Sequence, residues 1–345
     1  MTTYAQVFCT LAEIEDALKN RGAEKESFYL PKIEAVSQFM QMDFGLILPV
    51  TLARNFNGWG KTRLFIPPLL SATAIVNDGT SLVAADFIEQ PDGGHWPNGP
   101  YSYIDVDPDA TNLSYWVEEE EGISITGLWG LYNLVKSLGI TLGAAQSTAA
   151  ETTMQVSDGS KVSPGMVVVV ESEQEYVEST NATPVTSVTT ITEPITDTTT
   201  QTITLASADL VNVGEIFRID LEKFKVLDKN DTTEAAYVER GWDKTIPATH
   251  SDNAVVDVYR KFNVTRGVNG TTAATHAISK AVSRQAVPND IRELCVKMTA
   301  RAIQDGQSGY SGVVGDPNTG ESKYLFVKPY EYEEILSKYR IREAR

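Results

Sequence analysis

The chain has few cysteines, few histidines and no long apolar run. Two Cys and three His occur in 345 residues, and Cys9 and Cys295 stand near opposite ends of the sequence. Two such distant cysteines do not make a disulfide framework, so they indicate a reducing compartment, and we interpret both as simple core thiols. No stretch approaches the roughly 18 apolar residues that span a bilayer, and no leader-like pattern opens the sequence. We therefore expect assembly in a cytoplasm and no membrane partner.

Basic residues are scarce relative to acidic ones. Lys and Arg number 29 and Asp and Glu number 46, which gives a net charge of −17. A general nucleic-acid binder needs a basic face to contact phosphates, so this balance disfavours that class. The hydrophobic fraction of 42% is that of a folded protein, and a length of 345 residues favours two domains over one.

One sequence pattern occurs twice. Residues 240–250 read RGWDKTIPATH and residues 266–276 read RGVNGTTAATH, so Arg-Gly opens each copy and Ala-Thr-His closes it. Upstream, residues 152–177 and residues 201–226 both read as a short strand, a turn and two longer strands. Each half has too little apolar surface to bury alone, so the two units should pack as a pair.

One possible arrangement nests the second unit inside the first. Residues from about 201 to 257 would form the second unit, and residues 258–284 would return as the tail of the first. The order of the pieces, two front halves and then two Arg-Gly…His halves, suggests it. Residues 181–200 are rich in Thr and Val, which leaves both extended structure and a mobile arm or hairpin tip open.

The histidines of the repeat allow two interpretations. His250 and His276 could bind one metal ion together, but their spacing offers no nearby Cys or carboxylate as a further ligand, so we predict no metal site. The more ordinary interpretation is a turn in which glycine supplies backbone freedom while Thr and His side chains cap the loop. The residues that we assign to these turns are Arg240, Gly241, His250, Arg266, Gly267, Gly270 and His276.

Two pairs of carboxylates lie in the predicted strands of the repeat. Glu173 and Glu175, like Asp220 and Glu222, are two residues apart, which places each pair on one face of a strand. Such a pair could work as acid and base, but salt bridges or hydrogen bonds to the arginine loops of the repeat are the more ordinary role. We predict no catalytic residue, no cofactor and no enzymatic activity.

Helical patterns stand at both ends of the chain. A capping box at residues 10–13 starts one helix, and a second helix runs over about 25–42. We interpret its Phe39 and Met40 as core packing rather than as a binding groove. Two more helices are predicted within residues 286–342.

The outer segments carry a series of motifs in a fixed order. They are the two N-terminal helices, an Arg54–Phe56 pair, the Leu64–Leu69 strand with Pro67-Pro68, a closing Ile123–Gly130 strand ending in Gly-Leu-Trp-Gly, Ala300-Arg301 in a late helix, and a terminal segment from Pro329 to Arg340. Together they resemble the head–tail connector (adaptor) family of long-tailed bacteriophages. The resemblance covers about residues 5–130 and 286–342. Each motif is weak alone, so the order and spacing carry it, and a long insert separates the closing strand from the late helix.

The resemblance implies an α+β fold and a structural function. The expected architecture is a small connector core of helices and antiparallel strands built from residues 1–145 and 285–345, with an inserted all-β two-unit domain over residues 146–284. The implied function is a homo-oligomeric ring, usually of twelve subunits, that docks under the phage portal protein in the virion neck and meets downstream neck or tail proteins. DNA would pass through its lumen without sequence-specific binding. The acidic charge fits a lumen that repels DNA and lets it slide.

The C-terminal segment of that family contacts the portal or the next ring. By this resemblance the partner-binding residues are Tyr330, Ile335, Leu336, Tyr339, Arg340, Arg342 and Arg345. The main alternative is a baseplate or capsid decoration protein whose β insert binds a glycan or a host surface, which a cluster of aromatic residues on one face of the insert would favour. A hydrolase that uses the carboxylates of the repeat is the weakest of the three.

Overall fold

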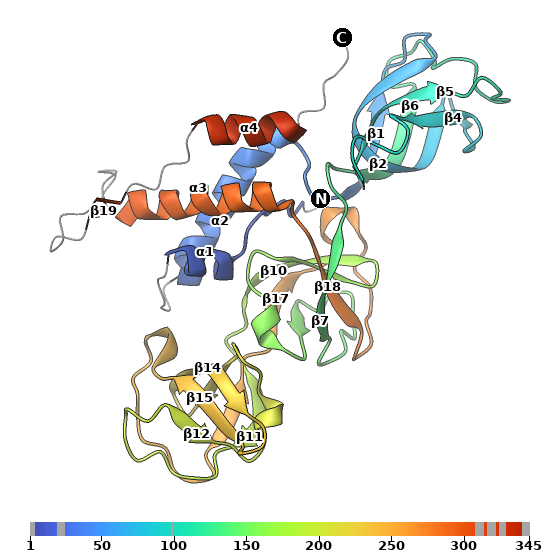
Figure 1. Cartoon of the computed structure of the whole chain (residues 1–345). Helices are drawn as coiled ribbons and strands as arrows, with labels where there is room; N and C mark the ends of the chain where they lie inside the picture. The colour runs from blue at the N-terminus through green and yellow to red at the C-terminus, as the bar shows by residue number, and fades with distance from the viewer. Residues whose placement is uncertain are drawn as a thin grey trace.

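The computed structural model describes residues 4–18, 25–97, 99–307, 314–315, 322–323 and 329–339. They form three antiparallel sheets of six strands each and a layer of four helices (Figure 1). The helices are α1 Leu11–Leu18, α2 Lys25–Phe44, α3 Asn289–Gln307 and α4 Pro329–Tyr339. Two short strands, β19 Val314–Gly315 and β20 Ser322–Lys323, pair with each other.

The first sheet takes its strands from one continuous stretch of the chain. Its strand order is β1-β6-β2-β5-β4, with β3 paired to β2. Alternate residues of β6 point into a separate apolar core, in which Trp116 and Trp129 are both fully buried. The strands are β1 Val50–Phe56, β2 Arg63–Asn77, β3 Thr80–Ser81, β4 Phe87–Gln90, β5 Tyr101–Val106 and β6 Ile123–Trp129.

The second sheet is interrupted in sequence. Its order is β7-β18-β9-β10-β17-β8, so its last two strands in sequence return to the sheet after a long excursion. The strands are β7 Val135–Thr141, β8 Thr153–Gln155, β9 Val167–Val170, β10 Glu173–Thr180, β17 Lys261–Thr265 and β18 Ala281–Gln285. A short 3-10 helix, η1 Gly159–Lys161, follows β8, and another, η4 Val268–Gly270, follows β17.

The residues between β10 and β17 form the third sheet, which has the same topology as the second. Its order is β11-β16-β13-β14-β15-β12, and each position matches its counterpart in the second sheet. The nesting of one unit inside the other, which the sequence suggested, is therefore confirmed, although the second unit begins earlier than expected because β11 comes from the Thr-rich segment. The strands are β11 Val185–Thr190, β12 Thr202–Thr204, β13 Ile216–Ile219, β14 Glu222–Asn230, β15 Ala235–Glu239 and β16 Val255–Val258, with 3-10 helices η2 Ala208–Leu210 and η3 Trp242–Lys244.

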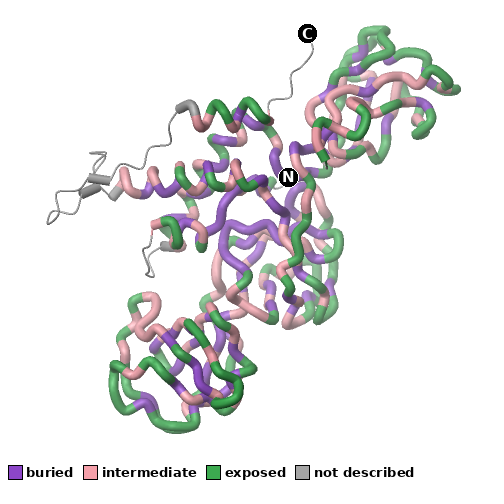
Figure 2. Tube along the Cα trace, viewed as in Figure 1, coloured by how far each residue is buried: buried purple, intermediate pink, exposed green. Residues whose placement is uncertain are grey.

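The helical layer is built from both ends of the chain. The capping box forms as expected, since the Thr10 N–H donates to Glu13 Oε2 at 2.9 Å. One core joins the N-terminal and C-terminal helices, and Figure 2 shows buried backbone where this layer meets the second sheet. Its fully buried members include Ile14, Ile33, Met40, Ile291 and Ile303. Among the described residues, no helix is long and apolar enough to cross a membrane.

The expected α+β connector core is wrong. The protein is mostly β, and the strands between residues 50 and 129 do not share the core of the helices. The physical reason is that this stretch holds enough alternating apolar side chains, two tryptophans among them, to bury a core of its own. The helices instead cover the second sheet, from which Val167 and Val268 enter their core.

A buried ion pair fixes the junction between the second and third sheets. Arg260, in the short link from β16 to β17, donates to both oxygens of Glu215 at 2.6 and 2.7 Å. The Gly159 N–H of the second unit donates to the same carboxylate at 2.8 Å. Because Glu215 is 1% exposed, this contact holds the two units together without solvent screening.

Gly270 joins the second sheet to the first. It has a φ of +77°, and a Cβ added there would lie 1.9 Å from the Thr51 carbonyl oxygen of β1. Gly270→Ala is therefore expected to lower the free energy of unfolding by about 1–3 kcal/mol, because the loop must move away from β1. Denaturant unfolding measures this loss. Gly139→Ala is the matched control, since Gly139 has a φ of +70° with nothing within 4 Å. An equal loss in both variants would contradict the close approach.

Candidate functional site

Each copy of the repeat builds one cluster of an arginine, a glutamate and a histidine. The first cluster is Glu173, Arg266 and His276, and the second cluster is Glu222, Arg240 and His250. In each, the glutamate is the first residue of a central strand, the arginine lies just beyond the neighbouring strand, and the histidine lies ten residues after the arginine. All three residues of each cluster lie together, so the repeat that is visible in the sequence is a repeat of one contact network.

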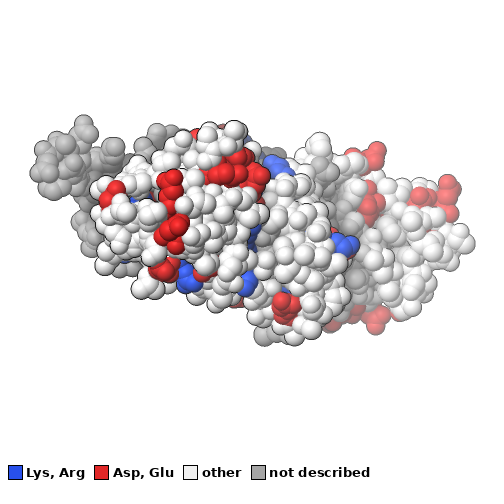
Figure 3. All heavy atoms as spheres, turned by 90° about the horizontal axis from the view of Figure 1, so that it is seen from below, with Lys and Arg blue, Asp and Glu red and all other residues white. Residues whose placement is uncertain are grey.

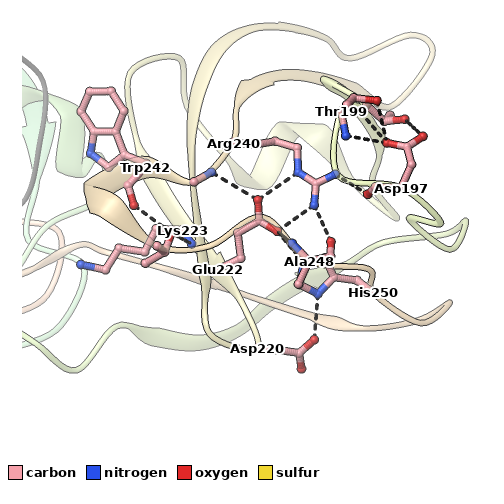
Figure 4. Close-up of polar contacts among 12 residues, drawn as sticks. Asp197, Thr199, Asp220, Glu222, Lys223, Arg240, Trp242, Ala248 and His250 are labelled. Atoms are coloured by element: carbon pink, nitrogen blue, oxygen red, sulfur yellow. Dashed lines mark hydrogen bonds and ion pairs between the residues drawn. The ribbon is translucent and has the colours of Figure 1, made fainter.

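The second cluster surrounds the carboxylate of Glu222 with donors (Figure 4). Arg240 donates from Nε to Oε1 at 2.9 Å and from Nη2 to Oε2 at 2.7 Å, in a bidentate pair. The Gly241 and Ala248 N–H groups donate at 3.2 and 2.9 Å. His250 Nε2 lies 2.9 Å from Oε2. Gly241 has a φ of +62°, the left-handed conformation that turns its N–H toward the carboxylate.

The first cluster repeats these contacts almost atom for atom. Arg266 donates to the two oxygens of Glu173 at 2.7 Å each, the Gly267 and Ala274 N–H groups donate at 3.0 and 2.9 Å, and His276 Nε2 lies 2.8 Å from Oε2. Gly267 also has a φ of +62°. Both glutamates are 1% exposed.

Each histidine is held between two carboxylates. His250 Nδ1 lies 2.8 Å from Asp220, and His276 Nδ1 lies 2.8 Å from Glu171, both on the preceding hairpin turns. Both ring nitrogens of each histidine thus have a carboxylate partner, which fixes the orientation of the ring. The hydrogen bonds of the carboxylates to the arginine loops, expected from the sequence, are confirmed in both copies.

The electrostatics make the central glutamates poor acids and bases. Burial by itself raises the pKa of Glu222, but Arg240, His250 and the Ala248 N–H outweigh it and hold that pKa below its ordinary value. Burial likewise raises the pKa of Glu173, and Arg266, the Ala274 N–H and His276 reverse the effect. Each carboxylate already accepts all the donors around it. The arrangement therefore holds a loop against a hairpin.

The two histidines do not meet at a shared metal site. Both nitrogens of each ring are engaged by carboxylates of its own unit. Ligand atoms of Glu173, Glu175 and His276 do lie within 4.8 Å of one another. The guanidinium of Arg266 sits against the same carboxylates and supplies the positive charge that they need.

Glu175 is a further carboxylate beside the first cluster, and the second cluster has no counterpart of it. Arg266 Nε lies 3.2 Å from its Oε1, but that N–H donates to Glu173, so Oε1 accepts no hydrogen bond. Gln146 donates to the other oxygen at 3.0 Å. Burial raises the pKa of Glu175. The equivalent residue of the third sheet is Phe224, which is fully buried, so this position tolerates an apolar side chain.

Glu175→Gln is expected to keep stability at pH 7 unchanged or to raise it by about 1 kcal/mol. A carboxyl whose pKa is higher in the folded state contributes most below the unfolded pKa and loses that contribution as pH rises through the folded pKa. The gain of the variant should therefore shrink as pH falls toward 4.5, the ordinary glutamate value. Denaturant unfolding between pH 4.5 and pH 7 measures it. Glu173→Gln, the control two residues away, should instead cost about 3–5 kcal/mol, and similar losses in both would refute the assignment.

The loops after the two arginines differ in what they contact. In the first unit, Asn269 exchanges two hydrogen bonds with the backbone of Ala5, at 2.8 and 3.3 Å, and is fully buried. Its counterpart Asp243 instead pairs with Lys223 at 2.6 Å and is partly exposed. Gly270, assigned to these turns from the sequence, is replaced by Lys244, which also has positive φ. The first loop thus anchors the N-terminal segment, which the sequence did not indicate.

Three of the seven residues assigned to partner binding pack in the helical core. Leu336 is 4% exposed, and Ile335 and Tyr339 pack against the same core, with the Tyr339 hydroxyl donating to Asp290 at 2.8 Å. Leu336 therefore has no surface to offer a partner, because α4 needs it to hold its place. Tyr330 belongs to α4. The three arginines of that assignment, Arg340, Arg342 and Arg345, lie outside the described residues.

The sequence analysis missed an exposed apolar stripe on α2, made of Phe28, Ala35, Phe39 and Met42. Their spacing of seven, four and three residues places them on one side of a helix. Phe28 is 42% exposed, Phe39 is 52% exposed and Met42 is 82% exposed. Phe39 had been interpreted as core, and only Met40 is buried. The available signal was that α2 is apolar on several sides, which is typical of a helix covered on more than one face.

Comparison of the chain with models of protein families, with curated proteins and with solved structures finds no match.

Proposed function

We propose that the protein is a structural component of a phage neck, a ring-forming adaptor that docks under the portal and joins it to the tail, without enzymatic activity. The observation that carries this proposal is the α2 stripe. A folded monomer rarely leaves large aromatic and thioether side chains in one exposed row, and such rows mark interaction surfaces. The order of the sequence motifs, which resembles the order in connector proteins, indicates which class of assembly the protein would form.

A second copy of the chain is the partner that best fits the stripe. The stripe lies on the helical layer, which is built from the two ends of the chain and carries the resembling motifs of both. A contact between this surface and a different surface of the next copy closes into a ring when the rotation between copies divides a full turn. The stripe would then be buried around the whole ring.

The charge of the chain supports a channel for DNA. One copy carries −17, so twelve copies would carry roughly −200 before counterions. On the face seen in Figure 3, acidic side chains form several patches and basic ones are few. A negative lumen repels the DNA backbone, which favours passage without binding.

The alternative, a decoration or baseplate protein that binds a glycan through its β insert, gains less support. Stacking against a sugar needs aromatic rings side by side on the surface. In the third sheet Phe217 and Phe224 stack on each other at 5.0 Å inside the core. Tyr237 is exposed on β15, and Trp242 is half-buried beneath Lys225, whose Nζ lies 4.3 Å from the ring.

Binding to the portal is the direct test of the proposed function. The purified protein mixed with its portal is expected to co-sediment as a complex. Reversal of the three C-terminal arginines to glutamate (R340E, R342E and R345E) should abolish that complex and leave self-assembly intact, because the resemblance assigns these arginines to the portal contact. Reversal of Lys61, Lys136 and Lys161, three exposed lysines elsewhere, changes the net charge equally and should leave binding unchanged. A chain that never binds portal would contradict the proposal.

A further inference from the structure

The two cysteines of the chain meet inside the helical layer. Cys9 lies just before α1 and Cys295 lies on α3, and their Sγ atoms are 3.3 Å apart. They are the only cysteines, and 286 positions separate them in the sequence. Cys9 is 2% exposed and Cys295 is fully buried. Both are core thiols, as expected from the sequence, but their contact was not expected and arises because the fold brings the two chain ends together.

The surroundings of the pair differ for the two sulfurs. The Ser37 hydroxyl lies 3.5 Å from Cys295 Sγ, and the Thr299 hydroxyl lies 4.0 Å from Cys9 Sγ. The hydrogen bond between the two thiols lowers the pKa of Cys295 and raises the pKa of Cys9. The two sulfurs are therefore close enough for one to attack the other once the first is oxidised.

A small oxidant has room beside the pair. Cys9 lines a cavity of about 30 Å³ together with Thr10, Glu13 and Arg292, among other residues. That volume holds a molecule of the size of water or hydrogen peroxide but not a bulky disulfide reagent. Because the thiols are buried beside so small a cavity, a peroxide is favoured over glutathione disulfide as the reactant.

We propose that Cys9 and Cys295 form an oxidative cross-linking site, at which a small peroxide converts the two thiols into a disulfide that ties the two ends of the chain together. In the first step the thiolate of one of the two cysteines attacks one oxygen of hydrogen peroxide. The S–O bond forms, the O–O bond breaks, and the leaving hydroxide takes a proton to become water. In the second step the sulfur of the other cysteine attacks the sulfenic acid. The S–S bond forms, the S–O bond breaks, and a second water leaves with the thiol proton, so two thiols are oxidised and one peroxide is reduced.

Only a small movement of the two sulfurs is needed to form this cross-link. A disulfide bond is about 2.05 Å long, so the sulfurs must approach by about 1.2 Å, and the bend before α1 can supply that movement. The bond would close a loop that spans nearly the whole chain and would restrict the unfolded ensemble strongly. In a virion, assembly would proceed with the thiols reduced, and the cross-link would form after release. That timing depends on the proposed function, whereas the chemistry of the pair does not.

The experiment uses the full-length protein, purified with a reductant and then desalted. It is dosed with increasing hydrogen peroxide in the native state, and the reaction is then quenched. The protein is denatured at neutral pH in the presence of iodoacetamide, which labels the remaining thiols, and is mapped by peptide mass spectrometry. Met42 is 82% exposed, so its sulfoxide reports on the same sample that the oxidant was effective. We expect a disulfide-linked peptide pair, loss of both alkylated cysteines, and a thermal midpoint several degrees above that of the reduced protein.

Two single variants assign the roles of the sulfurs. Neither Cys9→Ser nor Cys295→Ser can form the disulfide, so the variant that keeps the first-reacting cysteine should give a sulfenic acid that dimedone traps, and the other should keep an unreacted thiol. The comparison of oxidised and reduced wild type stands by itself if a variant does not fold. Both cysteines remaining alkylated at a dose that oxidises Met42 would overturn the proposal, as would a disulfide between two chains. Neither outcome would bear on ring formation or portal binding.

Discussion

Arg240→Ala is expected to lower the free energy of unfolding of the third sheet by about 3–5 kcal/mol. The substitution leaves the Glu222 carboxylate buried at 1% exposure without its bidentate partner. It also frees the backbone carbonyls of Asp197 and Ala248, to which the guanidinium donates. A buried charge that loses its counter-ion costs far more than the pair contributed, because the remaining charge has no access to water.

The matched control for Arg240→Ala is an arginine of the same geometry at the surface. Arg63 makes a bidentate pair with Asp105 at 2.7 and 2.8 Å, but its side chain is 48% exposed. Arg63→Ala should cost less than about 1 kcal/mol, since water replaces the lost partner. Hydrogen exchange resolves the two sheets separately. Equal protection losses in the first and third sheets would show that the cluster has no special structural role.

Phe39→Asp combined with Met42→Asp is expected to dissociate the assembly into single chains. The two carboxylates would lie in the C-terminal half of the stripe, and burying them in a contact between copies would cost several kcal/mol without a partner. Both positions are exposed in the single chain, so its fold should survive, with a circular dichroism spectrum like that of wild type. Sedimentation velocity measures the mass of the particles.

Leu221→Asp is the control for the α2 variant. Leu221 is 87% exposed at the tip of a hairpin of the third sheet, so the same chemical change is made far from the helical layer. This variant should assemble as wild type does. Dissociation by Leu221→Asp, with no effect of the α2 pair, would move the contact from the helices to the third sheet.

The duplicated part of the fold could be predicted because its contacts constrain residue type. The positions of Arg240 and His250 admit few substitutes, since each must donate hydrogen bonds to the same carboxylate, and so the two copies kept matching residues. The glycine after each arginine is kept by its positive φ. A contact network of hydrogen-bonded side chains therefore requires particular residue types at fixed positions, which can be recognised in the sequence, whereas apolar packing does not.

The separate core of the first sheet could not be predicted in the same way. Alternating side chains indicate a strand and a buried face, but they do not say which surface covers that face. Trp129 would look the same in sequence whether it packed on the helices or, as it does, among the strands of its own sheet. The resemblance to connector proteins favoured packing on the helices. Residues 50–129 instead have enough apolar surface to form a core of their own.

In the candidate sites, too, some contacts could be predicted from the sequence and others could not. The carboxylates Glu173 and Glu222 were matched to the arginine loops correctly, because the strand period and the repeat together fix their neighbours. The contact of Cys9 with Cys295 depends on how the segment before α1 packs against α3, and no local pattern encodes it. The outward face of α2 was missed because a sequence does not distinguish an apolar residue that covers a core from one that covers another chain.

The native mass of the purified wild-type protein tests the central claim most directly. The account predicts one closed particle whose mass is a whole multiple of the 37.8 kDa chain, and which does not grow with concentration. A single chain of 37.8 kDa at every concentration, both alone and with portal present, would contradict it.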